Sequence, residues 1–171
     1  MQDVEVSIGE DGCVEVRGAA VGDSYWPDAS ERLRDGVFRT SDLGEIIAGR
    51  VHLRGREGDQ INVAGRKISP EVVEKALLGH EAVKECLVFG IPSAEAERGE
   101  TIVGCLVLSD KLPVEALRSY LIHKLPAWQV PREWWLVDSL GVNHRGKVSR
   151  ADWKTRYLAA RADNLFSTTQ G

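Results

Sequence analysis

The sequence has few cysteines and places none of them at the spacing of a metal site. Its three cysteines, Cys13, Cys86 and Cys105, lie far apart and form no C-x-x-C pair. Cys86 and Cys105 lie inside apolar runs, so we expect small core residues with free thiols. The four histidines are scattered and none pairs with a cysteine at ligand spacing, which argues against zinc. Free thiols favour a reducing compartment, so we expect the cytoplasm.

The chain also lacks long apolar runs and any excess of positive charge. No segment approaches the ~20 apolar residues that cross a bilayer, and MQDVEVSIGE has neither the basic nor the apolar region of a signal peptide. The net charge of −4 gives no general attraction to nucleic acid or to an anionic membrane. Arg145, Lys147 and Arg150 form no continuous basic stripe, so nucleic-acid binding is a poor hypothesis. Any binding of phosphate has to be local.

A phosphate-binding loop is absent as well. The glycine-rich stretch GREGDQINVAGRKI (55–68) matches neither G-x-x-x-x-G-K-[ST] nor G-x-G-x-x-G, and it does not open a helix directly. Its plain interpretation is a hairpin whose turns use glycine for positive φ. By itself the chain has no visible cradle for a triphosphate.

The residues that are present predict two parts of different texture. A hydrophobic fraction of 43% with 28% charged residues allows an ordinary core, and 171 residues suit one domain, or a small domain plus part of another. Residues 3–54 are rich in strands: VEVSI and CVEVRG flank an EDG turn, and GEIIA and RVHL flank a second turn. No helix of three turns is expected before residue 69.

After residue 69 helices and strands alternate. Ser69-Pro70 opens a helix, with the serine as N-cap, and further helices are expected near Pro113 and from Ser149. Ser149 and Asp152 form a capping box. Strands are expected at 83–91, 101–109 and 132–138. The predicted units are residues 1–57, 58–163 and a flexible tail, 164–171.

Three motifs occur in series. They are FRTSDLGEI (38–46), GREGDQINVAGRKISPEVVE (55–74) and NHRGKVSR (143–150). In order and spacing they resemble AMP-forming acyl-CoA synthetases, a superfamily that includes luciferases and the adenylation domains of peptide synthetases. SYWPD (24–28) fits as well, and the resemblance covers roughly residues 12–158.

The resemblance implies an α+β fold. A small strand-rich piece, the distal part of a large N-terminal domain, would precede a compact, mobile C-terminal domain with a small mixed sheet flanked by helices. The phosphate loop and the acyl pocket of the large domain are not seen in this sequence. We therefore expect a fragment, a split subunit or a degenerate relative, inactive alone. ATP with Mg²⁺ and coenzyme A would act only in the complete enzyme, with none held tightly by this chain.

Two residues resemble contacts to the ribose of ATP. Asp42 matches the family aspartate, and an ionised carboxylate can accept hydrogen bonds from both ribose hydroxyls. From the residue alone, a turn aspartate bonded to its own backbone is the commoner explanation. Ser41 replaces the usual glycine before it. Arg56 matches a second ribose contact, although its five donors suit a surface salt bridge equally well.

Lys147 matches the family lysine that enters the active site during adenylation. A carboxylate that attacks a phosphate brings two anions together, and a compact ammonium on a long stem can bridge them. Gly146 lets the backbone approach closely. The alternative is a solvated loop lysine, the commonest fate of this residue type. His144 is expected to be exposed, since no nucleophile accompanies it.

The remaining matches concern the rotation of the C-terminal domain and the binding of the thiol substrate. Gly58 falls at the family's pivot, where an aspartate or lysine is usual; glycine can absorb a hinge rotation. Asn62, Gly65 and Lys67 fall on the surface that resembles a site for coenzyme A or a carrier protein. Their plain explanation is a turn glycine with solvated neighbours.

Two functions of different class remain open at this point. The first is the lid portion of an ATP-dependent ligase that joins a carboxylic acid to coenzyme A or a carrier thiol, working with the large domain. The second is a non-catalytic interaction module that keeps the lid fold and binds a protein through its tryptophans, Trp134, Trp135 and Trp153 among them.

Overall fold

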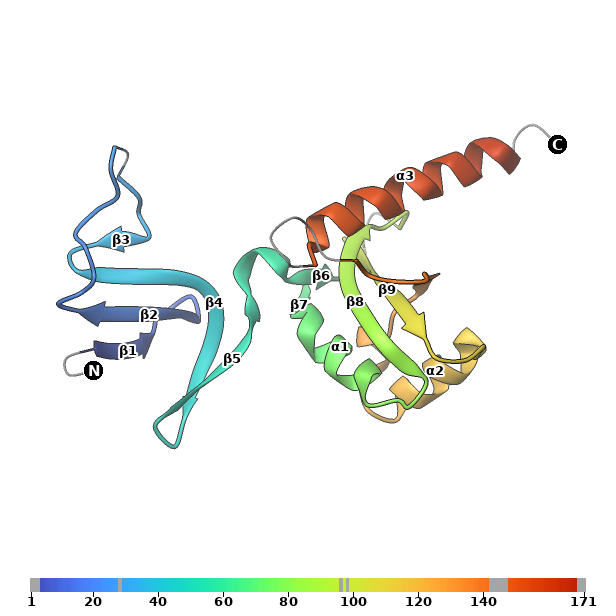
Figure 1. Cartoon of the computed structure of the whole chain (residues 1–171), viewed down its shortest axis with the longest axis horizontal. Coiled ribbons are helices and arrows are strands. Elements are labelled where there is room, and N and C mark those ends of the chain that lie inside the picture. Colours follow the sequence, from blue (N-terminus) through green and yellow to red (C-terminus); the bar gives the residue numbers. More distant parts are fainter. Residues whose placement is uncertain (1–3, 28, 96, 98, 142–147, 169–171) are drawn as a thin grey trace. The chain divides into compact units, whose positions relative to one another are not determined.

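A computed structural model describes residues 4–27, 29–95, 97, 99–141 and 148–168, with the backbone alone for 163–168. The chain divides into two compact units, residues 1–58 and 59–171 (Figure 1). No helix in these described ranges is long and apolar enough to cross a membrane.

The first unit is an antiparallel sheet without a helix of three turns in its described residues, as the sequence predicts. Its strands are β1 (Val4–Ile8), β2 (Cys13–Gly18), β3 (Leu33–Arg34), β4 (Val37–Ile47) and β5 (Arg50–Arg56). The sheet order is β1-β2-β4-β3, and β5 pairs with β4. Both hairpins expected from the turn residues are present, and the second is longer than the sequence suggested because β4 begins at Val37.

A register shift in the β4–β5 hairpin decides which residues face one another. From the turn outward the ladder pairs Ile47 with Arg50 and continues to Gly44 with Leu53. The register then shifts between Leu43 and Gly44, which is the signature of a β-bulge. An uninterrupted ladder would pair Asp42 with Gly55; because of the shift, Asp42 faces Arg56.

The second unit is the α+β structure expected from the sequence. After the 3₁₀ turn η1 (Glu57–Asp59), its elements are β6 (Ile61–Val63), β7 (Arg66–Ile68), α1 (Pro70–Leu78), β8 (Val83–Pro92), β9 (Glu100–Leu108), α2 (Val114–Ile122), the 3₁₀ turn η3 (Ala127–Gln129), β10 (Glu133–Leu136) and α3 (Arg150–Thr168). The sheet order is β10-β9-β8, with β8 antiparallel and β10 parallel to β9. The sheet is therefore mixed. β6 and β7 form a separate small hairpin.

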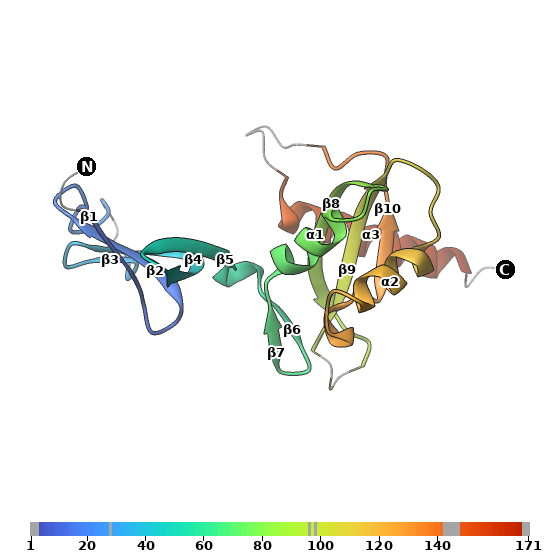
Figure 2. The ribbon, with the colours of Figure 1, turned by 90° about the horizontal axis from the view of Figure 1, so that it is seen from below.

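Both faces of this sheet are buried, which explains the near-continuous apolar runs of β8 and β9. Val88, Ile102 and Leu106 face a core shared with α1 and α2. Leu87 and Val103, whose side chains point to the other face, belong to a second core that includes Trp153 of α3. Helices α1 and α2 thus cover one face and α3 the other (Figure 2).

The helix starts are close to prediction, with one difference in chemistry. Ser69 has the extended backbone of an N-cap, yet its side chain makes no capping hydrogen bond. At α3 the backbone N–H of Asp152 donates to Ser149 Oγ at 3.3 Å, one half of the expected capping box. Helix α3 continues to Thr168 and so includes residues 164–168, which we assigned to the tail.

The thiols are core residues, as expected for Cys86 and Cys105. All three cysteines are free, with Cys13 and Cys105 buried and Cys86 half-buried. Burial raises the pKa of the Cys86 thiol to about 12, and it does the same for Cys105. These groups are therefore poor nucleophiles and poor metal ligands at neutral pH.

Candidate functional site

Asp42 and Arg56, the two predicted ribose contacts, lie opposite each other on β4 and β5. Arg56 Nε donates to Asp42 Oδ1 at 3.0 Å. Residues directly opposite in an antiparallel pair project from the same face of a sheet. The structure thus brings together two residues that the sequence separates by a hairpin.

This pair has unused hydrogen-bonding capacity. The Arg56 side chain is 63% exposed and that of Asp42 is 35% exposed. Within the described residues, no hydrogen bond reaches Asp42 Oδ2 or the two terminal nitrogens of Arg56. An acceptor oxygen and two donor nitrogens lie beside each other in solvent, which is the arrangement needed to bind a vicinal diol. Neither side chain has to leave a buried partner first.

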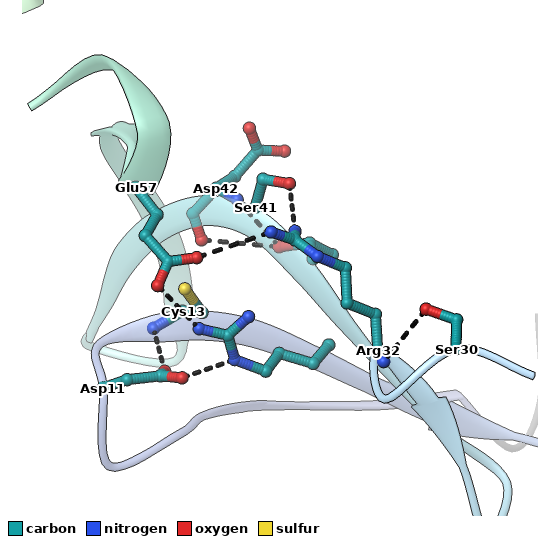
Figure 3. A network of polar contacts seen from close by, with 9 residues as sticks. Asp11, Cys13, Ser30, Arg32, Ser41, Asp42 and Glu57 are labelled. Carbon is teal, nitrogen blue, oxygen red and sulfur yellow. Dashed lines mark hydrogen bonds and ion pairs between the residues drawn. The ribbon is translucent and has the colours of Figure 1, made fainter.

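Next to this pair, Glu57 is bound by two arginines of the first unit. Arg39 Nη2 donates to Glu57 Oε1 at 3.0 Å, and Arg32 Nη2 lies 3.6 Å from Glu57 Oε2. Arg32 also donates to Ser41 Oγ. Figure 3 shows Arg32 between Ser41 and Glu57. The serine that replaces the usual glycine therefore has a structural partner.

The same network continues to the β1–β2 turn. Arg39 donates to Asp11. The other carboxylate oxygen of Asp11 accepts from the backbone N–H of Cys13 at 2.8 Å (Figure 3). The Cys13 N–H and the Arg39 guanidinium hold the pKa of Asp11 below its usual range. These contacts attach Glu57, the last residue before Gly58, to the body of the first unit.

On the other side of Gly58, Asp59 is bound within the second unit by Arg150 at the start of α3. Arg150 Nη1 lies 2.9 Å from Asp59 Oδ2, and Nη2 contacts Glu71 at 2.9 Å. The same nitrogen contacts both carboxylate oxygens of Glu74, at 2.8 and 3.0 Å. One guanidinium thus serves three carboxylates, which leaves the cluster with an excess of negative charge.

The cluster also closes the outer edge of β8. The backbone N–H of Val88 donates to Glu74 Oε1 at 2.8 Å, and the carbonyl of Val88 accepts from Arg150 Nε at 3.2 Å. Burial raises the pKa of Glu74 against the opposing effects of Val88 and Arg150. Burial alone would lower the pKa of Arg150, but Glu74, Glu71 and Asp59 raise it. The guanidinium remains charged at any physiological pH.

The three residues predicted for the thiol side lie on the β6–β7 hairpin. Asn62 faces Lys67 across the two strands, and both are exposed. Gly65 lies in the turn with φ of +79°, after Ala64 with φ of +51°, which is the geometry of a turn that requires left-handed backbone. Glu100 fixes this hairpin to β9 by accepting from the Asn62 N–H at 2.8 Å.

Comparison with known protein families shows which family contains the second unit of this chain. Residues 72–147, which contain the mixed sheet, helix α2 and all of helix α1 except its first two residues, match the family described as AMP-binding enzyme C-terminal domain. This part of the chain is the C-terminal domain of the AMP-binding enzyme superfamily. The resemblance given by the three sequence motifs is thereby confirmed, and so is the α+β fold.

The relatives of this chain are named for different carboxylic acids and for different thiol acceptors. A probable 2-succinylbenzoate–CoA ligase of Mycobacterium tuberculosis is 33% identical over 89% of this chain. A fatty acid–acyl-carrier-protein ligase of Streptomyces coeruleorubidus is 32% identical over 78% of it. The solved structure of o-succinylbenzoate CoA synthetase from Bacillus subtilis, in complex with the acyl-adenylate intermediate, superposes with a TM-score of 0.80, at 27% identity over 90% of this chain. The chain spans only 41%, 26% and 34% of the lengths of these three proteins.

Four residues named in the sequence analysis fall outside the residues that the structure describes. They are His144, Arg145, Gly146 and Lys147. Arg150 is described, and it is bound to Asp59, Glu71 and Glu74. This engagement argues further against the weak hypothesis of a nucleic-acid site that includes Arg150, because its guanidinium is already occupied by carboxylates.

The tryptophans of the second unit do not form an exposed patch among the residues that the structure describes. Trp153 is 4% exposed and its indole N–H donates to the carbonyl of Leu140 at 3.2 Å. Trp135 packs edge-to-face on Trp153 with ring centroids 5.3 Å apart, and Trp134 packs against the core beneath α1 and α2. Their main role is to fill the core on either side of the sheet.

Sequence reasoning missed the carboxylates on each side of Gly58. Glu57 and Asp59 read as ordinary charged residues of a polar stretch. Their partners Arg39 and Arg150 lie 18 and 91 positions away. The one available signal was that these arginines lie within two of the three sequence motifs, 38–46 and 143–150. Their position in the sequence does not tell which carboxylate each arginine binds.

Proposed function

We propose that this chain is the C-terminal lid portion of an ATP-dependent carboxylic acid–thiol ligase. Together with a large AMP-binding domain, on the same polypeptide or a separate one, it would form an acyl-adenylate and then a thioester. The phosphate loop and acyl pocket would come from the large domain. ATP is the cosubstrate, and Mg²⁺ would neutralise its phosphates.

The pairing of Asp42 with Arg56 carries this proposal. The family resemblance selects these two residues as ribose contacts, and they lie in register at 3.0 Å with free donors and an acceptor directed to solvent. Asp42 would accept from the ribose hydroxyls while Arg56 donates to them. The exchange of an exposed ion pair for the ribose costs little, because such pairs contribute only about 0–1 kcal/mol.

Lys147 would act in the first half-reaction. The substrate carboxylate approaches an α-phosphate that is also negative, and negative charge increases on the phosphate oxygens in the transition state. An ammonium placed between the two groups stabilises that charge more than it stabilises the ground state. Pyrophosphate then leaves, and the acyl group remains joined to AMP through a mixed anhydride.

Asn62, Gly65 and Lys67 would act in the second half-reaction, after rotation about Gly58. Because a Cβ at Gly65 would meet nothing within 4 Å in the described chain, its backbone lies open to an approaching pantetheine. Lys67 would meet a phosphate of the thiol donor. Relatives act on CoA in one case and on an acyl carrier protein in the other, so both acceptors are candidates.

The interaction module has less support. It would use a tryptophan-bearing surface, whereas Trp153 is buried and Trp134 and Trp135 are half-buried against the core. Exposed Trp26, at 95%, is a single side chain and makes no patch of the size that partners usually require.

A complementation assay tests the ligase. This chain, the large AMP-binding domain of the same enzyme, and their mixture are each assayed for ATP–pyrophosphate exchange, with 2-succinylbenzoate and a saturated fatty acid as probes. We expect exchange in the mixture and none with this chain alone. Exchange by the isolated chain, or a mixture that stays inactive with every acid while the large domain binds ATP, would overturn the proposal.

A further inference from the structure

We propose that Arg150 is a positioning residue for the adenylation step. It fixes the start of α3 to the first residue after the pivot, and thereby sets the place from which Lys147 is presented. The proposal rests on the proposed function for the role of Lys147, and on the described geometry for everything else.

Each nitrogen of the Arg150 guanidinium has an acceptor. Nε donates to the Val88 carbonyl, Nη1 to Asp59, and Nη2 to Glu71 and Glu74. The side chain is 21% exposed, so the contacts are better shielded from water than those of a surface pair. A planar fork with five donors is required to serve acceptors in these directions at once, and a lysine could hold only some of them.

The contacts exceed what α3 needs in order to begin. Ser149 already accepts from the Asp152 N–H, and Trp153 anchors the first turn in the core. Three carboxylates around one cation is also a costly arrangement, because charged groups lose hydration and two of the negative charges are unbalanced. A cluster of this kind adds specificity of placement rather than simple stability.

Covalent connectivity gives the cluster its proposed role. Lys147 precedes Arg150 by three residues, so their Cα atoms lie at most about 11 Å apart whatever path the chain takes. Asp59 follows Gly58 directly. Within the second unit, the Arg150–Asp59 ion pair therefore joins the residue after the predicted pivot directly to the start of α3, three residues after Lys147.

Arg161 provides a matched comparison on the same helix. It makes one ion pair, with Glu133 at 3.1 Å, and its side chain is 39% exposed. It lies three turns further along α3 and contacts neither the joint nor α1 in the described chain. Its replacement tests the loss of an arginine ion pair from α3 without touching the link to Asp59.

The experiment uses the complete enzyme, or the reconstituted mixture, with the variants Arg150→Lys, Asp59→Asn and Arg161→Gln. Each is assayed for ATP–pyrophosphate exchange and for thioester formation from a presynthesised acyl-adenylate. Arg150→Lys should slow exchange roughly 10–100-fold, since misplacement by about 1 Å has effects of that size. Thioester formation should stay within twofold and the KM for ATP within threefold. Asp59→Asn should act in the same direction with a smaller effect, and Arg161→Gln should change neither step.

Amide hydrogen exchange gives a readout that needs no activity. Arg150→Lys and Asp59→Asn should raise the exchange rate at residues 149–153 several-fold, and Arg161→Gln should leave it unchanged. If Arg150→Lys slowed pyrophosphate exchange and thioester formation equally, Arg150 would serve only the folding of the domain. If it slowed neither reaction, the proposal would be wrong. A wild-type mixture without pyrophosphate exchange instead defeats the proposed function, which the wild-type arm detects by itself.

Discussion

Glu57 and Asp59 are separated by one residue, yet their carboxylates are bound into different units. Glu57 is held by Arg39 and Arg32 of the first unit, and Asp59 by Arg150 of the second. Gly58 between them carries no side chain, and a Cβ there would meet nothing within 4 Å of the described chain. The ion pairs attach both neighbours of Gly58 to their own units, so the predicted pivot is the one residue of this 3₁₀ turn without a side chain.

The first prediction compares two glycines of this region. Gly58 lies in a 3₁₀ turn without positive φ, so Gly58→Ala should raise the free energy of unfolding by about 0.4–1 kcal/mol through the unfolded state. Gly65 has φ of +79°, so Gly65→Ala should lower it by about 1–2 kcal/mol. Urea unfolding followed by tryptophan fluorescence measures both. If the two substitutions shift stability in the same direction, the backbone assignment at one of them is wrong.

The second prediction concerns the ribose contacts. In the complete enzyme, Asp42→Asn and Arg56→Gln should each lower kcat/KM for ATP roughly 10–100-fold, the cost of losing a hydrogen bond to a charged group. The stability of the chain should fall by at most about 1 kcal/mol, because the pair is exposed. Pyrophosphate exchange at varied ATP measures the first quantity, and thermal unfolding measures the second.

A nearby ion pair supplies the control for these two variants. Arg54 and Glu45 also face solvent on β5 and β4, and the family resemblance gives them no ligand. Arg54→Gln should leave kcat/KM for ATP unchanged. An equal fall of kcat/KM for ATP in Arg54→Gln would show that the hairpin as a whole matters and that Asp42 and Arg56 have no special role.

The third prediction separates the two half-reactions. Lys147→Ala should slow pyrophosphate exchange by about 10²–10³-fold, equivalent to about 3–4 kcal/mol, because one charge contact to the transition state is lost. Lys67→Ala should do the reverse, slowing thioester formation from a presynthesised acyl-adenylate while sparing exchange. Each variant is the control for the other. Equal effects of both substitutions on both steps would contradict alternate use of two faces.

Local patterns predicted most of the fold. The apolar runs at 83–91 and 101–109 gave strands that end within a residue or two of β8 and β9, because a strand buried on both faces leaves a near-continuous run. Pro70 and Ser149 marked helix starts through their backbone and capping chemistry. These patterns did not predict that the Ser69 side chain makes no capping hydrogen bond. That outcome depends on how the side chain packs in the folded protein.

The pairing at the candidate site was harder to predict, because it depends on a one-residue irregularity. Counting back from the turn would pair Asp42 with Gly55, and only the shift between Leu43 and Gly44 brings Arg56 opposite. The Arg150 cluster was out of reach for another reason. It joins residues up to 91 positions apart, and charges at such separations have no periodicity that links them.

The fourth prediction uses the thiols to test whether the cores are closed. With a pKa of about 12, Cys86 and Cys105 are ionised to only ~10⁻⁴ at pH 8, whereas a free cysteine is ionised to roughly one part in four. Since the thiolate is the reactive form, a disulfide reagent at pH 8 should label both about 10³-fold more slowly than a free thiol. Burial raises the pKa of Cys13 too, so it should also react slowly.

All three thiols should become reactive in 6 M guanidinium, which provides the control within one sample. Mass spectrometry of digested, partly labelled protein assigns the rate to each cysteine. Cys86 is the most informative, because its Sγ lies 3.5 Å from the carbonyl of Glu74, next to the residue that binds Arg150. If Cys86 reacted rapidly in the native chain while Cys105 did not, then α1 would open from β8 in solution, and the Arg150 cluster could not hold the joint as a fixed unit.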